Sequence, residues 1–168
     1  MIPQIKKILF ATDLSKNAAY AFYYAVHMAK RDEAKIVILH AVEPLAPMLI
    51  TFGDFSHQVV KDRWEDTVKK FKERIQDISV KVDARMGTSS VDLVSNIVIR
   101  LGKPVEEILK VADEEGCDVI VLGTHSKGFL KQTLLGSVSS SVLIRTRKPV
   151  FVIPLPSENT NIDLLGTE

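Results

Sequence analysis

The stretch Ile120-Val121-Leu122-Gly123-Thr124-His125-Ser126, which runs on to Leu134-Leu135-Gly136-Ser137-Val138, is the most informative part of this sequence. An apolar run ends at a glycine, a short polar loop follows, and a glycine–serine pair opens a segment with helical spacing. Such a loop places backbone N–H groups at a helix start, where the partial positive charge of the helix favours an anion. The stretch therefore predicts a strand, an anion-binding loop and a helix.

Five short apolar runs, one of them in this stretch, predict strands. They show little alternation of polar and apolar residues, which is typical of strands that are covered on both faces. The runs cover residues 7–12, 35–42, 92–101, 118–122 and 148–154.

Segments with apolar residues at helical spacing separate these runs. Ser15 is a natural N-cap for the first of them, and Pro104 suits the first turn of the third. Gly87 and Gly116 are expected to end the second and third helices. The predicted helices begin after Ser15, near Val60, at Pro104 and after Gly136, and they end near Arg31, Gly87, Gly116 and Arg147.

Strict alternation of strands and helices predicts an α/β fold: an open, five-stranded, parallel, doubly wound sheet with strand order 3-2-1-4-5 and helices on both faces. Ligands bind such sheets beyond the carboxyl ends of the strands, where the winding reverses. The loop at residues 11–13 would then face the loop that starts at Gly123, with Ala41 beside them. We expect one domain over residues 1–154 and a polar tail over 155–168.

Composition excludes several classes of protein. The net charge of +1 across 168 residues argues against a nucleic-acid-binding surface, which needs a basic face. The single cysteine, Cys117, permits no intrachain disulfide and is expected to be buried at a strand start. No apolar run approaches the roughly 18 residues of a membrane span, and no signal-peptide pattern opens the chain, so we expect a cytoplasmic protein without membrane contact. The first strand is not followed by GxGxxG, so a dinucleotide-binding Rossmann site is not supported. The motif GxxxxGK[S/T] does not occur either, which argues against a P-loop NTPase.

These patterns resemble the universal stress protein family, and the loop resembles that of its ATP-binding branch. The branch has the pattern G-x-x-G, nine residues, then G-[S/T]; here Gly123, Gly136 and Ser137 match it, and Ser126 replaces the second glycine. Further similar stretches lie at residues 8–15, 39–42, 102–104 and 148–154.

The resemblance implies a bound adenine nucleotide, ATP or AMP. In this reading the backbone of Ala41 contacts adenine, and Asp13 lies beside the sugar and phosphates, where it can help to hold Mg²⁺. Gly123 approaches the ribose. The phosphates are bound by the loop at Ser126 and Lys127 and by the helix start at residues 136–138. The implied nucleotide-binding residues are Ala11, Thr12, Asp13, Ala41, Gly123, Ser126, Lys127, Gly136, Ser137 and Val138.

The resemblance also implies a homodimer through the edge strand at residues 149–154, acting as a nucleotide-responsive regulator of a protein partner that the sequence does not identify. The sequence shows no nucleophile with an adjacent base and no acid–base pair of carboxylates, so a dedicated enzyme is not expected. Two functional alternatives stay open: a dimeric scaffold that binds no nucleotide, and a slow ATP hydrolase.

Purely structural roles, which involve no ligand, also stay open for single residues. Asp13 can cap its own loop, Gly123 can serve only the turn, and Ser137 can be only an N-cap. Lys127 is by default an exposed loop lysine. Four apolar residues at positions 129, 130, 134 and 135 belong either to the core or to a dimer contact.

Overall fold

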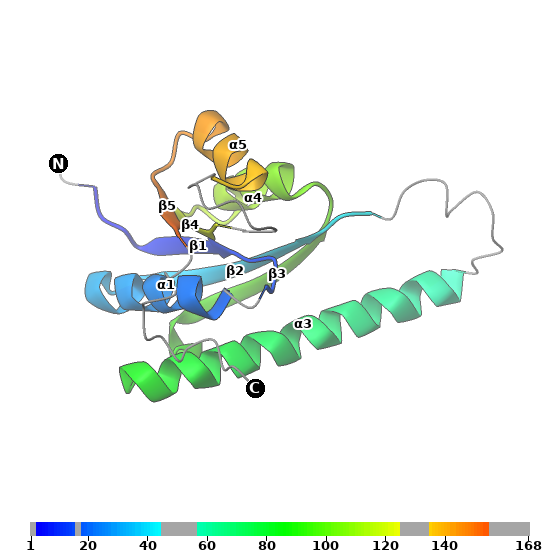
Figure 1. Ribbon diagram of the computed structural model, residues 1–168, viewed down its shortest axis with the longest axis horizontal. Coiled ribbons are helices and arrows are strands. Elements are labelled where there is room, and N and C mark those ends of the chain that lie inside the picture. The colour runs from blue at the N-terminus through cyan, green and yellow to red at the C-terminus, as the bar shows by residue number, and fades with distance from the viewer. Residues whose placement is uncertain (1–2, 16–17, 45–56, 125–134, 155–168) are drawn as a thin grey trace.

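The computed structural model describes residues 3–15, 18–44, 57–124 and 135–154, with the backbone alone for 57–60. Strands and helices alternate along the chain, as the sequence predicts (Figure 1). In order they are β1 (Lys7–Ala11), α1 (Ala18–Asp32), β2 (Lys35–Val42), α3 (His57–Met86), the 3₁₀ turn η1 (Val91–Leu93), β3 (Val94–Leu101), α4 (Pro104–Glu114), β4 (Val119–Gly123), α5 (Ser137–Arg145) and β5 (Val150–Ile153).

The five strands form one parallel sheet in the order β3-β2-β1-β4-β5, which confirms the predicted topology. β1 lies at its centre, so that Phe10 is in register with Ile38 of β2 and with Val121 of β4. The strands beside β1 are not edge strands, because β2 pairs with β3 and β4 pairs with β5. With helices on both faces as well, these three strands are buried, which explains their mainly apolar sequences.

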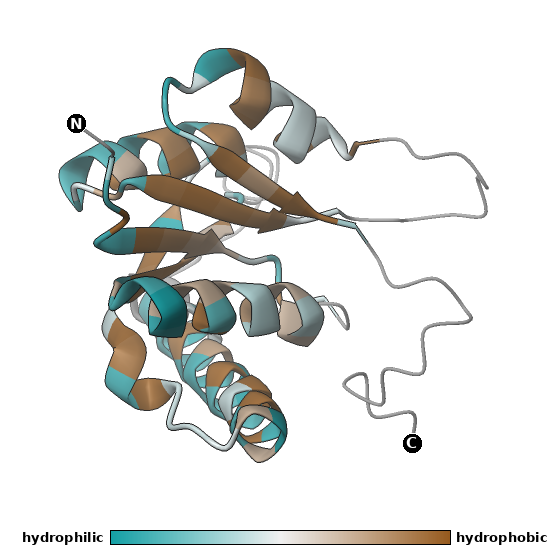
Figure 2. Cartoon of the chain, turned by 90° about the vertical axis from the view of Figure 1, so that its left-hand side faces the viewer, coloured by the Kyte–Doolittle hydropathy of each residue, from teal (hydrophilic) through white to brown (hydrophobic). Residues whose placement is uncertain are grey.

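Helices cover both faces of the sheet (Figure 1). Phe10, Phe22 and Phe71 belong to the core between the sheet and the helices α1 and α3, whereas Leu9 and Val142 belong to the core beneath α4 and α5. In Figure 2 the apolar strands lie between helices whose outer faces are more polar. Since the chain changes face after β3, the winding reverses between β1 and β4.

The boundaries of several elements differ from those predicted. Asp92 and Leu93 belong to η1, so the third strand begins only at Val94. Its predicted start fails because these residues turn the chain after α3, and the Asp92 carbonyl oxygen accepts a hydrogen bond from Lys35 Nζ at 2.8 Å. The end of α4 agrees with its prediction: the helix ends at Glu114, near Gly116, whose φ of +62° is the left-handed conformation of a helix terminus.

Further local features agree with the sequence. Cys117 is buried before β4, and this burial raises the pKa of its thiol to about 11. Among the described helices, none combines the length and the apolar character that crossing a bilayer demands. The predicted tail over 155–168 and the apolar residues at positions 129, 130 and 134 lie outside the described residues; Leu135 is exposed.

Candidate functional site

A cavity of about 750 Å³ opens at the carboxyl edge of the sheet, where the winding reverses. It is bounded by the ends of β1, β2 and β4 and by the N-termini of α4 and α5. Its lining residues are Phe10, Ala11, Thr12, Asp13, Ser15, Ala18, Ala21, Leu39, Ala41, Glu43, Pro104, Ile108, Leu122, Gly123, Thr124, Gly136, Ser137, Val138 and Ser139.

The structure brings the predicted site residues together wherever it describes them. The turn after β1, the end of β2 and the start of α5 are far apart in the sequence, yet all three line this cavity. Ser126 and Lys127 lie outside the described residues. The residues placed on the cavity are Ala11, Thr12, Asp13, Ala41, Gly123, Gly136, Ser137 and Val138.

The turn after β1 is held by short-range hydrogen bonds. Asp13 Oδ1 accepts a bond from the Ser15 N–H at 2.9 Å, and Thr12 Oγ1 accepts one from the Leu14 N–H at 3.1 Å. Between them Leu14 has a φ of +60°, which is unusual for a residue with a side chain. Asp13 therefore does cap its own loop, and it lines the cavity at the same time.

The start of α5 supplies backbone donors. Its N-cap is Gly136, which has no side chain to accept a bond from the first turn, and the first intrahelical bond runs from the Ser140 N–H to the Gly136 oxygen at 2.9 Å. The N–H groups of Ser137, Val138 and Ser139 precede that bond and so have no partner within the helix, and these three residues line the cavity. Since Gly136 is the N-cap, the alternative that Ser137 serves only as N-cap is wrong.

Gly123 ends β4 in close contact with α1. A Cβ atom added to it would lie 3.4 Å from the Cβ of Ala21, and both residues line the cavity. Its φ is not in the left-handed range, unlike those of Gly87 and Gly116. The turn itself thus does not require glycine, and the absence of a side chain instead leaves room at the cavity wall.

The geometry therefore pairs a carboxylate on one rim with a helix N-terminus on the other. The model of the universal stress protein family matches residues 4–154. The chain belongs to the universal stress protein family.

Two curated relatives span nearly the same length as this universal stress protein. Universal stress protein MJ0577 of Methanocaldococcus jannaschii is 28% identical over 88% of this chain and 94% of its own. Universal stress protein YxiE of Bacillus subtilis is 31% identical over 88% of this chain and 97% of its own. The solved structure of MJ0577 covers 93% of this chain and 100% of its own, with a TM-score of 0.63 and 26% identity.

Two more distant structures share the fold and hold ligands. One universal stress protein was solved in complex with cAMP; it is 20% identical, covers 90% of this chain and 98% of its own, and has a TM-score of 0.57. The universal stress protein of Archaeoglobus fulgidus was solved with dAMP; it is 19% identical, covers 91% of this chain and 99% of its own, and has a TM-score of 0.54.

Sequence reasoning missed some lining residues of this universal stress protein. Ser139 is only 4% exposed and lies on the cavity, although nothing but its place two residues after Ser137 marks it in the sequence. Glu43 adds a carboxylate just beyond β2, and Pro104 brings the start of α4 to the rim. Glu43 could have been found from the sequence, because ligands bind beyond the carboxyl ends of the strands and Glu43 lies two residues after Ala41.

The described residues hold no cluster of three or more His, Cys, Asp or Glu side chains suited to a metal ion. The predicted magnesium therefore depends on Asp13 together with the phosphates of a ligand, and it stays a prediction.

Proposed function

We propose that this universal stress protein binds an adenine nucleotide, ATP or AMP, in the cavity between β1 and β4. The observation that carries the proposal is the meeting of Asp13 and the α5 N-terminus on one cavity. We further propose that bound nucleotide alters the surface that a homodimer presents to a protein partner.

The cavity fits a nucleotide in size and chemistry. Its volume of about 750 Å³ lies within the roughly 300–1,000 Å³ typical of small-molecule sites. Leu39, Ala41 and Ile108 provide apolar surface for a base. The first N–H groups of α5 and the positive end of its dipole suit phosphate oxygens.

Each rim would act differently on the ligand. Asp13 repels bare phosphates, so a divalent cation between its carboxylate and the phosphates would turn that repulsion into attraction. We therefore expect Mg²⁺ to strengthen ATP binding more than AMP binding, because ATP carries the larger charge. The cAMP and dAMP held by two structures of the same fold accord with an adenine base.

Isothermal titration calorimetry with ATP, AMP and GTP, each with and without Mg²⁺, tests this proposal. Asp13→Ala and Gly136→Val should each weaken ATP binding by about tenfold or more, the second because its side chain would crowd the phosphate site. Asp113→Ala is the matched control, since Asp113 lies on α4 away from the cavity and should leave the affinity unchanged. If millimolar nucleotide produces no binding heat and no thermal shift, the result favours the alternative of a scaffold that binds no nucleotide.

The homodimer proposal rests on β5, an edge strand of the sheet. An edge strand offers unpaired backbone groups to a second chain. Phe151 on β5 is 45% exposed, and Ile144 at the end of α5 is 84% exposed. Pairing of β5 with its copy in a second subunit would cover this apolar edge.

A further inference from the structure

His40 on β2 lies beside the candidate site without lining it. Its neighbours Leu39 and Ala41 line the cavity, and because side chains alternate along a strand, His40 points to the opposite face. There its ring stacks on Phe71 of α3, with ring centroids 5.1 Å apart and planes within 9°. This stacking fixes the plane of the imidazole.

The polar contact of His40 reaches the turn after β1. Its Nδ1 atom lies 2.9 Å from the carbonyl oxygen of Thr12. A carbonyl oxygen can only accept, so Nδ1 carries the proton and donates. The Thr12 N–H in turn donates to the Leu39 oxygen at 2.9 Å, and β2 therefore holds both polar groups of the Thr12 backbone.

The residues that follow Thr12 depend on this anchorage. Asp13 comes next, and Leu14 then adopts the left-handed conformation, which is unfavourable for a residue with a Cβ atom. Backbone preference therefore opposes the shape of the turn, which is held by the short-range bonds to Thr12 and Asp13 together with the anchorage of Thr12 on β2. Without the donor on His40, the half-buried Thr12 oxygen would lose its partner, and the peptide between Thr12 and Asp13 could rotate.

We propose that His40 is a positioning residue for the nucleotide site: by donating to the Thr12 carbonyl it fixes the turn that directs Asp13 into the cavity. The inference rests on the proposed nucleotide-binding function and deepens it. It assigns a role to a side chain that touches no ligand and acts only through Asp13.

The decisive variants separate the donor from the ring. His40→Phe keeps an aromatic ring against Phe71 but removes the N–H, whereas His40→Asn places an N–H at the same point along the side chain. His27→Phe is the control, because His27 also stacks on an aromatic ring, Tyr23, but on the exposed side of α1. Should His40→Phe not fold, His40→Leu and His40→Asn, whose side chains have the same number and branching of heavy atoms, make the same comparison.

Calorimetry with ATP and Mg²⁺ gives the first readout. His40→Phe should weaken binding about fivefold, the effect of one lost hydrogen bond. His40→Asn should come within twofold of the wild-type affinity, and His27→Phe should match it. In an Asp13→Ala background, His40→Phe should cause no further loss. Wild-type affinity in His40→Phe, or an equal loss with and without Asp13, would overturn the inference.

Amide hydrogen exchange by NMR gives a second readout that needs no nucleotide. The Leu14 and Ser15 N–H groups bond to the side chains of Thr12 and Asp13. Their exchange should accelerate at least tenfold in His40→Phe and return toward wild type in His40→Asn, while Val121 in β4 stays unchanged. Unchanged exchange at Leu14 and Ser15 would overturn the role of His40 whether or not ATP binds, whereas a wild-type protein that binds no ATP contradicts only the proposed function.

Discussion

Asp118 shows how one side chain fixes the edge of the sheet opposite the cavity. One oxygen of its carboxylate, Oδ2, accepts hydrogen bonds from the backbone N–H groups of Lys6 and Lys7, at 2.8 and 2.9 Å. The Lys7 side chain donates to the Glu115 carbonyl oxygen at 2.9 Å. These contacts tie the start of β1 to the turn before β4, and they set the alignment on which the cavity depends.

Removing this carboxylate should destabilise the protein. We expect Asp118→Ala to lower the free energy of unfolding by about 1–3 kcal/mol, because two backbone donors lose a charged acceptor. Urea denaturation followed by circular dichroism measures the change. Asp113→Ala is the control: its exposed carboxylate meets Lys148 at 3.3 Å, a surface pair worth less than about 1 kcal/mol. Equal losses in the two variants would show that the β1 anchor contributes nothing of its own.

At this scale, the sequence predicts residues whose role depends on type and spacing. Asp13, Gly123 and Gly136 follow from a strand end and a helix start. Ser139 and His40 do not, because their roles depend on which way a side chain points within an element. Nothing in the sequence around His40 indicates a contact with Thr12, because only the fold brings the two residues together.

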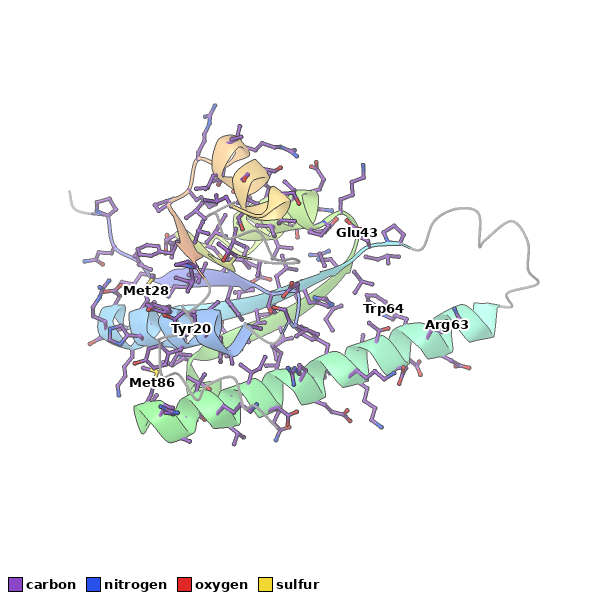
Figure 3. All side chains as sticks on the ribbon, viewed as in Figure 1. Tyr20, Met28, Glu43, Arg63, Trp64 and Met86 are labelled. Atoms are coloured by element: carbon purple, nitrogen blue, oxygen red, sulfur yellow. The ribbon has the colours of Figure 1, made fainter. Side chains whose placement is uncertain are left out.

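The side chains of helix α3 are not equally buried along its length. From the middle of the helix onward, Phe71, Ile75, Ile78 and Val82 are buried against α1 and the sheet. Figure 3 shows Arg63 and Trp64 near its other end, whereas Met86 lies close to α1. Polar residues and the pair Lys70–Asp66, at 2.7 Å, occupy the outer side. The stability of α3 therefore comes from its second half.

Two nearby residues of α3, one on its inner face and one on its outer face, test whether the helix packs on the sheet in this way. Ile78 is 3% exposed and Val80 is 62% exposed. Ile78→Ala should lower the free energy of unfolding by about 2–4 kcal/mol through a cavity, whereas Val80→Ala should change it by less than about 0.5 kcal/mol. Thermal unfolding of both variants measures the difference. A small effect of Ile78→Ala would mean that α3 does not pack on the sheet as described.

Elements with a regular apolar period were predictable from the sequence, and so were the ends that a glycine marks, but not every start. α3 ends one residue before Gly87, as its stop signal indicates. In contrast, two of the three residues of η1, Asp92 and Leu93, were predicted to belong to the third strand. Where the third strand begins to pair with β2 depends on how the backbone runs from α3 into β3, which is a tertiary property.

The whole molecule has a sheet with two different edges, β3 and β5. We expect only the β5 edge to form the homodimer. Phe151→Lys should convert the dimer to a monomer, because it places a charge in the apolar contact. Ile97→Lys, at a 39% exposed site on β3, should leave the dimer intact. Sedimentation velocity at several concentrations measures both; a dimer that survives Phe151→Lys would place the interface elsewhere.

The strand order was predictable because alternation of strands and helices with right-handed crossovers leaves few arrangements. The same rule predicted that the loops after β1 and β4 meet. The homodimer stays a prediction, because in the sequence Phe151 and Ile144 could equally have belonged to a second core layer.

A crystal structure of the protein grown with ATP and Mg²⁺ would show whether the cavity between β1 and β4 is the nucleotide site. We expect the phosphates to lie against the N–H groups of Ser137 and Val138, with the base beside Ala41 and the Asp13 carboxylate facing the sugar and phosphates. A nucleotide bound on another surface, or a cavity between β1 and β4 that stays empty at saturating ATP, would contradict it.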